Sequence, residues 1–272
     1  MKKVDIIIPT FEQEDYTVQC LKSIEKHTDK KLYRIIWVDN GSSRESRITV
    51  LNELQNHDYL TVWLEKRSGF VVAVNQGIKA CEGKYVVVLN NDTEVTNNWL
   101  EKLLYPFSQD KKIMITGPNT TEKTSKQSWD IISKKDERFI NMPILTDKDD
   151  DEINFLLEKQ YDKQYYDMPM LAFFCAVFRK KIFDEIGVLD EEYQEGYADD
   201  VDFSFRTLNA GYKLVYVPSV YIHHYHNVTF LSIYDKKDIS NKIHENRRLF
   251  KQKNKIESLS DAENRNYYQS IK

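Results

Sequence analysis

The sequence predicts an α/β domain in which helices flank a mostly parallel sheet. Short apolar runs recur along the first half of the chain, and they are continuous, as in strands that are buried on both faces. Segments with apolar residues at helical spacing separate these runs, and this alternation is typical of parallel strands joined by helices. Polar turns follow two of the runs, and open parallel sheets bind ligands beyond the carboxyl ends of their strands. The pattern therefore predicts the fold class and the edge of the sheet that carries a ligand site.

Each element of the first half has its own local signal. Five apolar runs predict strands, with Pro9 closing the first of them, at residues 4–8, 35–38, 60–64, 85–89 and 113–115. Apolar residues at helical spacing predict three helices between these strands, at residues 15–27, 48–54 and 71–80. A fourth helix, capped by Asn97, is expected to end at Tyr105.

The periodic pattern lapses between residues 118 and 168, which predicts an insertion. Because a structureless loop of that length is unusual, we expect a helix within it at residues 153–160. Regular structure is then expected to return as a strand, a helix stopped by Gly211, and a strand closed by Pro218, at residues 170–178, 199–209 and 213–217. After Phe230 the chain becomes polar and helical in pattern, with ten Lys or Arg against six Asp or Glu from Asp235 onward.

Composition excludes several classes of protein. A hydrophobic content of 41% excludes a disordered polar chain. With 39 basic and 43 acidic side chains the net charge is −4, which disfavours a nucleic-acid partner. No apolar run is long enough to span a membrane or to act as a signal peptide, so we expect a cytoplasmic chain. The three cysteines, Cys20, Cys81 and Cys175, are far apart and are expected to be free thiols.

Two acidic turns follow predicted strands. In the segment 39–43, Asp39 could accept hydrogen bonds from a ribose or a base edge. The alternative is an ordinary turn, because Asp, Asn, Gly and Ser all favour turns. In the segment 90–94, Asp92 could hold a hard divalent cation whose other positions a diphosphate fills. The alternative there is a turn in which the aspartate caps the next segment.

Two further clusters lie in the second half. Three carboxylates, Asp199, Asp200 and Asp202, begin a predicted helix, where the helix dipole favours them without any catalytic role. One of them could instead serve as a general base. Three histidines occur at residues 223–226 after a predicted strand, and imidazole binds Mn²⁺ or Zn²⁺. Unrelated surface histidines are the alternative.

The sequence lacks a glycine-rich phosphate loop, a nucleophile elbow and a dinucleotide fingerprint. We therefore expect that a metal ion neutralises any bound phosphates.

Taken in chain order, these motifs resemble the inverting glycosyltransferases of family 2. The matching segments are residues 6–11, 38–42, 69–70, 75–77, 89–93, 187–191, 199–206, 210–212, 223–224 and 229–230. The resemblance implies the GT-A fold, a Rossmann-like and mostly parallel sheet flanked by helices, with a C-terminal acceptor and helical part. The later segments look most like bacterial enzymes that build surface polysaccharide or glycosylate protein.

The resemblance also implies a division of the chain into three parts. Residues 1–117 would form the nucleotide-sugar-binding half. Residues 118–230 would form the acceptor side, with the 118–168 insertion, the catalytic base and the histidine motif. Residues 231–272 would form a helical tail.

The resemblance implies nucleotide contacts for eight residues. Asp39 would bind the nucleobase or ribose beside Pro9 and Thr10, and Asn90 would face the ribose. The remaining positions are Glu12, which replaces a common Asn, Arg67, which could touch a phosphate, and Asn75 and Asn91 within matching motifs.

The resemblance implies catalytic and metal-binding roles as well. Asp200 would be the catalytic base, with Asp199 in the place of the usual Glu of a Glu-Asp pair. Asp92, at the family's Asp-x-Asp position, would bind Mn²⁺ or Mg²⁺ together with His224, and His226 is a second candidate ligand.

The function expected on this basis is metal-dependent sugar transfer, with inversion, from a UDP or dTDP donor to a hydroxyl of a glycan, lipid-linked or protein acceptor. A nucleotidyltransferase is disfavoured because no glycine-rich basic loop follows the first strand. A non-catalytic glycan- or nucleotide-binding relative, or a partner subunit, is the other alternative. The basic tail could contact the inner face of an anionic membrane, could be a solvated face, or could join two copies in a homo-oligomer.

Overall fold

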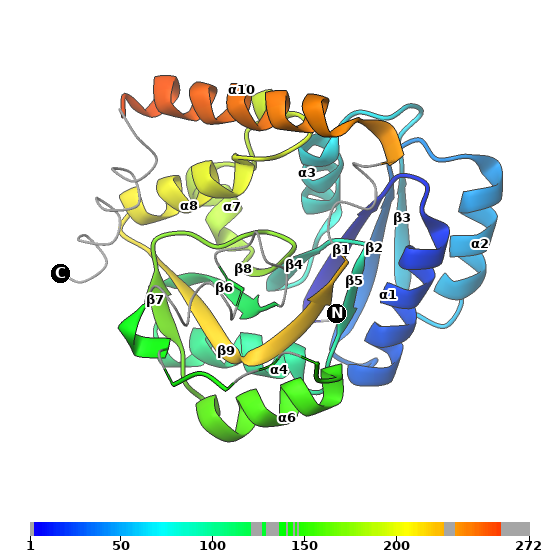
Figure 1. Cartoon of the computed structure of the whole chain (residues 1–272). Coiled ribbons are helices and arrows are strands. Elements are labelled where there is room, and N and C mark those ends of the chain that lie inside the picture. Colours follow the sequence, from blue (N-terminus) through cyan, green and yellow to red (C-terminus); the bar gives the residue numbers. More distant parts are fainter. Residues whose placement is uncertain are drawn as a thin grey trace.

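The computed structural model describes residues 3–120, 127–128, 136–139, 141–143, 145, 147–225 and 232–256. Helices cover both faces of a central sheet, as Figure 1 shows. The strands are β1 (Val4–Thr10), β2 (Tyr33–Asp39), β3 (Tyr59–Trp63), β4 (Tyr85–Leu89), β5 (Thr93–Val95), β6 (Ile113–Asn119), β7 (Tyr166–Met168), β8 (Cys175–Arg179) and β9 (Lys213–His224). The helices are α1 (Glu14–His27), α2 (Arg44–Leu54), α3 (Phe70–Ala80), α4 (Trp99–Gln109), α6 (Asp150–Tyr161), α7 (Lys181–Ile186), α8 (Asp199–Asn209) and α10 (Lys236–Asn254), with short 3₁₀ turns η1 (Glu137–Phe139) and η2 (Glu191–Tyr193).

The sheet is parallel in its first half and mixed in its second. Its strand order is β3-β2-β1-β4-β8-β6-β9-β5, with β7 also paired to β9. The pairs among β3, β2, β1 and β4 are all parallel, as the sequence predicts. Strand β8 enters antiparallel between β4 and β6, and β5 and β7 are antiparallel to β9. The parallel prediction is therefore confirmed for β1 to β4, whereas β5 and β6, which also fall within residues 1–117, have antiparallel neighbours.

The core occupies both sides of the sheet. Ile7 of β1 belongs to one hydrophobic cluster, and its neighbours Ile6 and Ile8 belong to the other. Alternate side chains of a strand point to opposite faces, so both faces of β1 are buried. This observation confirms the interpretation of continuous apolar runs as doubly covered strands.

Two prolines do not end the strands that they were expected to close. Strand β1 continues through Pro9, because it pairs with β4 only as far as Ile7 and so has a single neighbour at the proline. Strand β9 continues through Pro218 to His224. Its pairing with β6 shifts register between Val217 and Tyr221, so the proline lies in a β-bulge that bends the strand without ending it.

Two other expectations about local structure are corrected. The run at 170–178 forms a strand only from Cys175, because side chains take the preceding backbone N–H groups: Ser204 Oγ accepts from Leu171, and Gln127 Oε1 accepts from Ala172. Helix α4 begins after Asn98, whose φ is 58°, and Asn97 contacts His27 instead of capping the helix. The helix expected inside the insertion is present as α6. The three cysteines are free, as predicted, and all three are buried.

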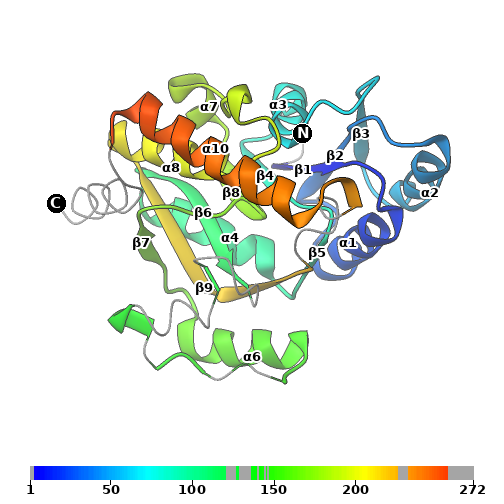
Figure 2. The ribbon, with the colours of Figure 1, turned by 45° about the horizontal axis from the view of Figure 1, so that its top comes forward.

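No helix in the described part of the chain is both long enough and apolar enough to cross a membrane. Helix α10 is long but polar, and it crosses the molecule above α7 and α8 in Figure 1 and in front of the sheet in Figure 2. Its Phe250 ring lies 5.7 Å from the Phe205 ring of α8, in an edge-to-face contact.

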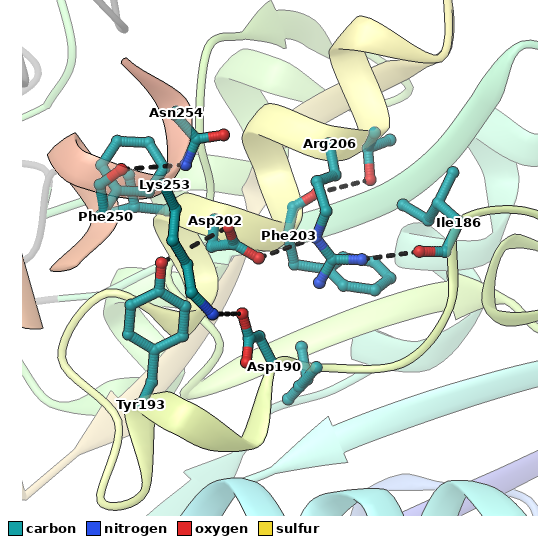
Figure 3. A network of polar contacts seen from close by, with 12 residues as sticks. Ile186, Asp190, Tyr193, Asp202, Phe203, Arg206, Phe250, Lys253 and Asn254 are labelled. Carbon is teal, nitrogen blue, oxygen red and sulfur yellow. Dashed lines mark hydrogen bonds and ion pairs between the residues drawn. The ribbon is translucent and has the colours of Figure 1, made fainter. Parts of the chain in front are cut away.

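Helix α8 is anchored by a buried ion pair, which Figure 3 shows with its neighbours. Arg206 Nε donates to Asp202 Oδ2 at 2.7 Å, and the Asp202 side chain is 6% exposed. The same guanidinium donates to the carbonyl oxygens of Ile186 and Val188 at 2.8 and 3.0 Å. Arg206 therefore ties α8 to the segment that follows α7.

Replacing Arg206 by methionine should lower the free energy of unfolding by about 2–4 kcal/mol, because Asp202 would be left as a buried charge without its cation. Urea denaturation measures the change. The double variant Asp202→Asn/Arg206→Met should recover part of the loss. Lys181→Met, which breaks an exposed pair with Glu185, is the matched control. Equal losses for Arg206→Met and Lys181→Met would contradict the anchoring role.

Candidate functional site

Asp92 and His224 come together at the carboxyl edge of the sheet. Asp92 lies in the turn between β4 and β5, and the next residue, Thr93, pairs with His224 of β9. Asp92 Oδ1 lies 3.2 Å from His224 Nε2, and both side chains are 8% exposed. The Phe174 ring stacks on the imidazole at 5.0 Å with an interplanar angle of 13°, which fixes the orientation of the histidine.

The separation of these two atoms suits a divalent metal ion. Adjacent ligands of an octahedral ion with bonds of about 2.1 Å lie about 3 Å apart. A carboxylate oxygen and an imidazole nitrogen are suitable ligands for Mn²⁺, and a pair of protein ligands leaves the other positions to phosphate oxygens and water. Asp92 and His224 therefore fit the metal that the sequence implies.

The two asparagines before Asp92 have different surroundings. Asn90 Nδ2 lies 3.5 Å from His224 Nε2, and Asn90 Oδ1 is buried with no hydrogen-bond partner within the described ranges. Asn91 donates through Nδ2 to Thr17 Oγ1 of α1 at 3.0 Å. Asn90 is thus placed beside the Asp92–His224 pair, and Asn91 anchors the turn to α1.

Asp39 is fully buried at the end of β2 and is held by a cation. Arg47 Nη2 lies 2.6 Å from Asp39 Oδ2, and the backbone N–H groups of Gly41 and Ser42 approach the same carboxylate at 3.3 Å. The Arg47 guanidinium also lies over the Trp63 ring, 5.2 Å from its centre. Sequence reasoning missed Arg47, because nothing in its helical neighbourhood distinguishes it from a surface arginine.

The end of β1 and the residues after it contact β2 and the segment that follows β2. Thr10 Oγ1 accepts from Trp37 Nε1 at 2.8 Å, one residue after the buried Pro9. Glu12 has a φ of 51°, and its carboxylate accepts from Ser43 N at 2.6 Å and from Ser43 Oγ at 2.9 Å. Ser43 caps α2, so Glu12 joins the end of β1 to the start of that helix.

Arg67 joins four segments that are distant in sequence. It forms an ion pair with Glu195 and donates through Nη1 to Tyr234 Oη at 3.1 Å, while Tyr234 donates to Glu195 Oε1 at 3.0 Å. The guanidinium lies 5.4 Å from the centres of the Phe11 and Tyr234 rings. The sequence signalled Arg67 but neither Glu195 nor Tyr234.

Asn75 lies apart from these residues, buried within α3. Its Nδ2 donates to Leu189 O at 2.8 Å and to Glu191 Oε1 at 3.0 Å, and its Oδ1 accepts from Leu189 N at 3.1 Å. The side chain is fully buried, so it has no exposed surface with which to contact a nucleotide. Its observed role is to hold the segment after α7 against α3.

The three carboxylates at the start of α8 have different environments. Asp199 is buried, and burial raises its pKa to about 6, although the backbone N–H groups of Ala198, Asp199 and Asp200 oppose the rise. Asp202 is engaged by Arg206. Asp200 is half-buried, and its Oδ1 accepts from Val201 N at 2.8 Å. Asp200 is therefore the most accessible carboxylate of the three.

The histidine cluster does not act as one group. His223 lies 3.2 Å from Asp150 Oδ1 of α6, and this hydrogen bond raises the pKa of His223 against the opposing effect of burial. His224 alternates with it along β9 and faces Asp92 instead. His226 lies outside the described residues.

A separate acidic and histidine cluster lies near the amino ends of β2 and β3. Ligand atoms of Glu25, Glu53 and His57 all lie within 4.8 Å of one another. Lys30 Nζ donates to Glu25 Oε1 at 2.5 Å, so an ammonium group already neutralises part of this cluster. It is distinct from the Asp92–His224 pair.

Residues 5–187 match the family described as Glycosyl transferase family 2. The chondroitin synthase of Pasteurella multocida (strain Pm70) is 24% identical over 226 residues, which cover 76% of this chain and 23% of that protein. A poly(ribitol-phosphate) beta-glucosyltransferase of Bacillus spizizenii is 30% identical over 118 residues, covering 42% of this chain and 18% of that protein. The chain spans less than a quarter of the length of these two relatives.

Two solved structures share the fold. GalNAc-T7 with UDP, GalNAc and Mn²⁺ superposes with a TM-score of 0.63 at 19% identity, covering 82% of this chain and 44% of that chain. Staphylococcus aureus TarS 1-349 in complex with UDP-GlcNAc gives a TM-score of 0.59 at 17% identity, covering 92% of this chain and 65% of that chain. These similarities confirm the GT-A fold predicted from the sequence.

The raised pKa of Asp199 predicts how stability depends on pH. Its pKa is about 6 in the folded chain against an ordinary 3.8, so the folded state holds this proton more tightly than the unfolded state. The resulting stabilisation is complete below pH 4 and is lost as the pH rises through 6. Asp199→Asn should therefore stabilise the fold at pH 7 relative to its effect at pH 4, measured by urea denaturation at both. A pH-independent difference between variant and wild type would contradict this assignment.

Proposed function

Because the chain belongs to glycosyl transferase family 2, we propose that it transfers a sugar from a nucleotide diphosphate donor to an acceptor hydroxyl, with inversion at the anomeric carbon. The observation that carries the proposal is the Asp92–His224 pair, whose ligand atoms lie 3.2 Å apart at the carboxyl edge of the sheet. The same edge receives the ends of β1 and β2, where Thr10 and Asp39 lie. This edge is where α/β sheets bind nucleotides.

The donor half comprises residues 1–117 and takes UDP or dTDP sugars. Asn90 lies beside the proposed metal ligands, and its buried Oδ1 has no hydrogen-bond partner in the described part of the chain, which supports a ribose contact at this position. Asp39 accepts hydrogen bonds from Gly41 N and Ser42 N and so holds the loop after β2, which is proposed to bind the nucleobase. Solved structures of this fold contain UDP, UDP-GlcNAc and GDP-Man, which supports a nucleotide sugar as the donor class.

Asp92 and His224 hold the metal, which is Mn²⁺ or Mg²⁺. When bound, the ion supplies positive charge that stabilises the departing diphosphate. The stacked Phe174 ring keeps the His224 imidazole in the plane that points Nε2 toward Asp92. Arg67 is a further cation at this edge, and it reaches the phosphates only if its ion pair with Glu195 opens.

Asp200 acts as the general base of a single in-line displacement. The acceptor oxygen forms a bond to the anomeric carbon as the bond from that carbon to the diphosphate breaks, and the electron pair of the broken bond leaves with the diphosphate. Asp200 takes the proton from the acceptor hydroxyl. Attack opposite the leaving group inverts the anomeric configuration. Asp199 is buried and engaged by backbone N–H groups, including that of Asp200, so it is less suited than Asp200 to meet an acceptor.

The acceptor side comprises residues 118–230, and the helical tail comprises residues 231–272. The acceptor is a glycan, a lipid-linked saccharide or a protein. The similarity to a poly(ribitol-phosphate) beta-glucosyltransferase and to a chondroitin synthase supports an acceptor that belongs to a polymer.

Asp200→Asn should lower the turnover number by about 10²–10⁴-fold, because an amide cannot take the acceptor proton. Nucleotide affinity in the presence of Mn²⁺ should remain within about twofold of wild type. Release of UDP from a panel of UDP sugars, and of dTDP from a panel of dTDP sugars, measures the first quantity. Calorimetric titration with UDP measures the second. A variant that keeps most of its turnover would show that Asp200 is not the base.

Asp92→Ala should weaken UDP binding in the presence of Mn²⁺ by about tenfold or more, because the ion loses one of its two protein ligands. The difference from wild type should vanish in EDTA. Asp150→Ala is the matched control, since it also removes an aspartate 3.2 Å from a histidine of β9 but lies outside the proposed metal site. Equal losses for the two variants would argue against a metal at Asp92.

A further inference from the structure

The loop that leads into α8 has an unusual backbone. Residues 194–198 are called the base loop here, because they lead into α8, whose second residue is the proposed general base Asp200. Gln194 has a φ of 47°, Gly196 of 102° and Tyr197 of 64°. A left-handed conformation is unfavourable for a non-glycine residue and persists only where surrounding contacts determine it. The contacts that hold the base loop therefore also fix the position of Asp200.

Helix α3 holds one side of the base loop. Val71 N, in the first turn of α3, donates to Gln194 O at 3.0 Å. Gly69, which precedes that helix, approaches the same carbonyl so closely that a Cβ there would lie 2.7 Å from it. These two contacts involve backbone atoms, and the Arg67 side chain, just before α3, adds an ion pair with Glu195 of the loop.

The side chain of Asn246, in the middle of α10, holds the other side. Asn246 Nδ2 donates to Tyr193 O at 2.9 Å and to Gly196 O at 2.5 Å. These two carbonyls belong to the turn that Gly196 N closes by donating to Tyr193 O at 3.0 Å. Both acceptors are carbonyl oxygens, so only the amide nitrogen of Asn246 can face them. The amide nitrogen thus contacts Gly196 O of the base loop and Tyr193 O, the residue immediately before the loop.

Asn246 is itself held firmly, because α10 is anchored on both sides of it. Tyr234, just before the helix, donates to Glu195 within the base loop. Phe250, one turn after Asn246, is fully buried against Phe205. Lys253 pairs with Asp190 and Glu192 near the other end of the helix, as Figure 3 shows for Asp190. The amide therefore sits on a fixed support.

We propose that Asn246 is a positioning residue for Asp200, and that α10 is the strap through which it acts. The inference rests on the proposed function, in which Asp200 is the base. Asn246 holds the turn whose conformation sets the direction in which α8 begins. A displacement of about 1 Å in a catalytic group can reduce turnover about 100-fold, so loss of this contact should be visible in catalysis before it is visible in folding.

Asn246→Asp is the test variant, since it keeps the shape of the side chain and removes both donors. We expect the turnover number, measured as UDP release from UDP-GlcNAc and UDP-glucose, to fall by about tenfold or more. The KM for the donor should change by less than about twofold, because the donor half is untouched. Asn246→Ser, which retains one donor, should give an intermediate turnover number.

Asn254→Asp is the matched control on the same helix. Asn254 donates to Phe250 O, a carbonyl of α10 itself, so this variant adds the same charge without touching the base loop. It should retain wild-type turnover. Equal losses for Asn246→Asp and Asn254→Asp would overturn the proposal in favour of a general effect of charge on α10.

A double-variant cycle separates positioning from general damage. If Asn246 acts through Asp200, Asn246→Asp should have no further effect on the residual turnover of Asp200→Asn. Additive losses would overturn the proposal. Retained turnover in Asp200→Asn would instead refute the proposed base, which is a different failure.

Hydrogen exchange tests the contact without relying on activity. Amides of the base loop should exchange about tenfold faster in Asn246→Asp than in wild type or Asn254→Asp, because Gly196 N loses the fixed carbonyl that it bonds. Unchanged exchange in the loop would show that Asn246 does not hold it, and would overturn the proposal even if turnover fell.

Discussion

The burial of β1, β2 and β4 on both faces is the constraint on which the rest of the site depends. Helices cover both sides of these strands, so their side chains cannot reach a ligand until the strand has ended. The strands are parallel neighbours, and their ends therefore share one edge of the sheet. Thr10, Asp39 and Asn90 stand at that edge. The polar site exists there because the earlier positions along these strands, apart from the Asp5–Arg34 ion pair at their amino ends, are committed to the core.

The mixed half of the sheet completes this edge from the other direction. Strand β9 first follows β6, then passes through the bulge after Val217, and finally pairs antiparallel with β5. Without the bend, a strand of this length would continue away from the turn after β4. With it, His224 arrives opposite Thr93 and beside Asp92. The imidazole is therefore placed by a long-range pairing, and the carboxylate is placed by a local turn.

The sequence predicted what local forces determine. The apolar runs of β1, β2 and β4 and the helical spacing of α1 identified the parallel half, and the turn after β4 marked Asp92 before any geometry was known. Residues that meet only in the tertiary structure could not be paired from local sequence patterns. Arg47, in the first turn of α2, forms an ion pair with Asp39. Arg67 contacts Glu195 and Tyr234, which lie 128 and 167 residues later in the sequence. The expectation that Pro218 ends its strand was wrong for the same reason, because the register shift there depends on the pairing of β9 with β6.

The base loop shows why those long-range partners matter. Gln194 and Tyr197 have left-handed backbones, a conformation that persists only where surrounding contacts determine it. These contacts come from α3, about 120 residues earlier, and from α10, about 50 residues later. Asp200 lies in the first turn of α8, directly after this loop, so contacts from both helices act on the segment that leads to it. Through Asn246, the polar helix α10 contacts the turn that leads into the acidic first turn of α8.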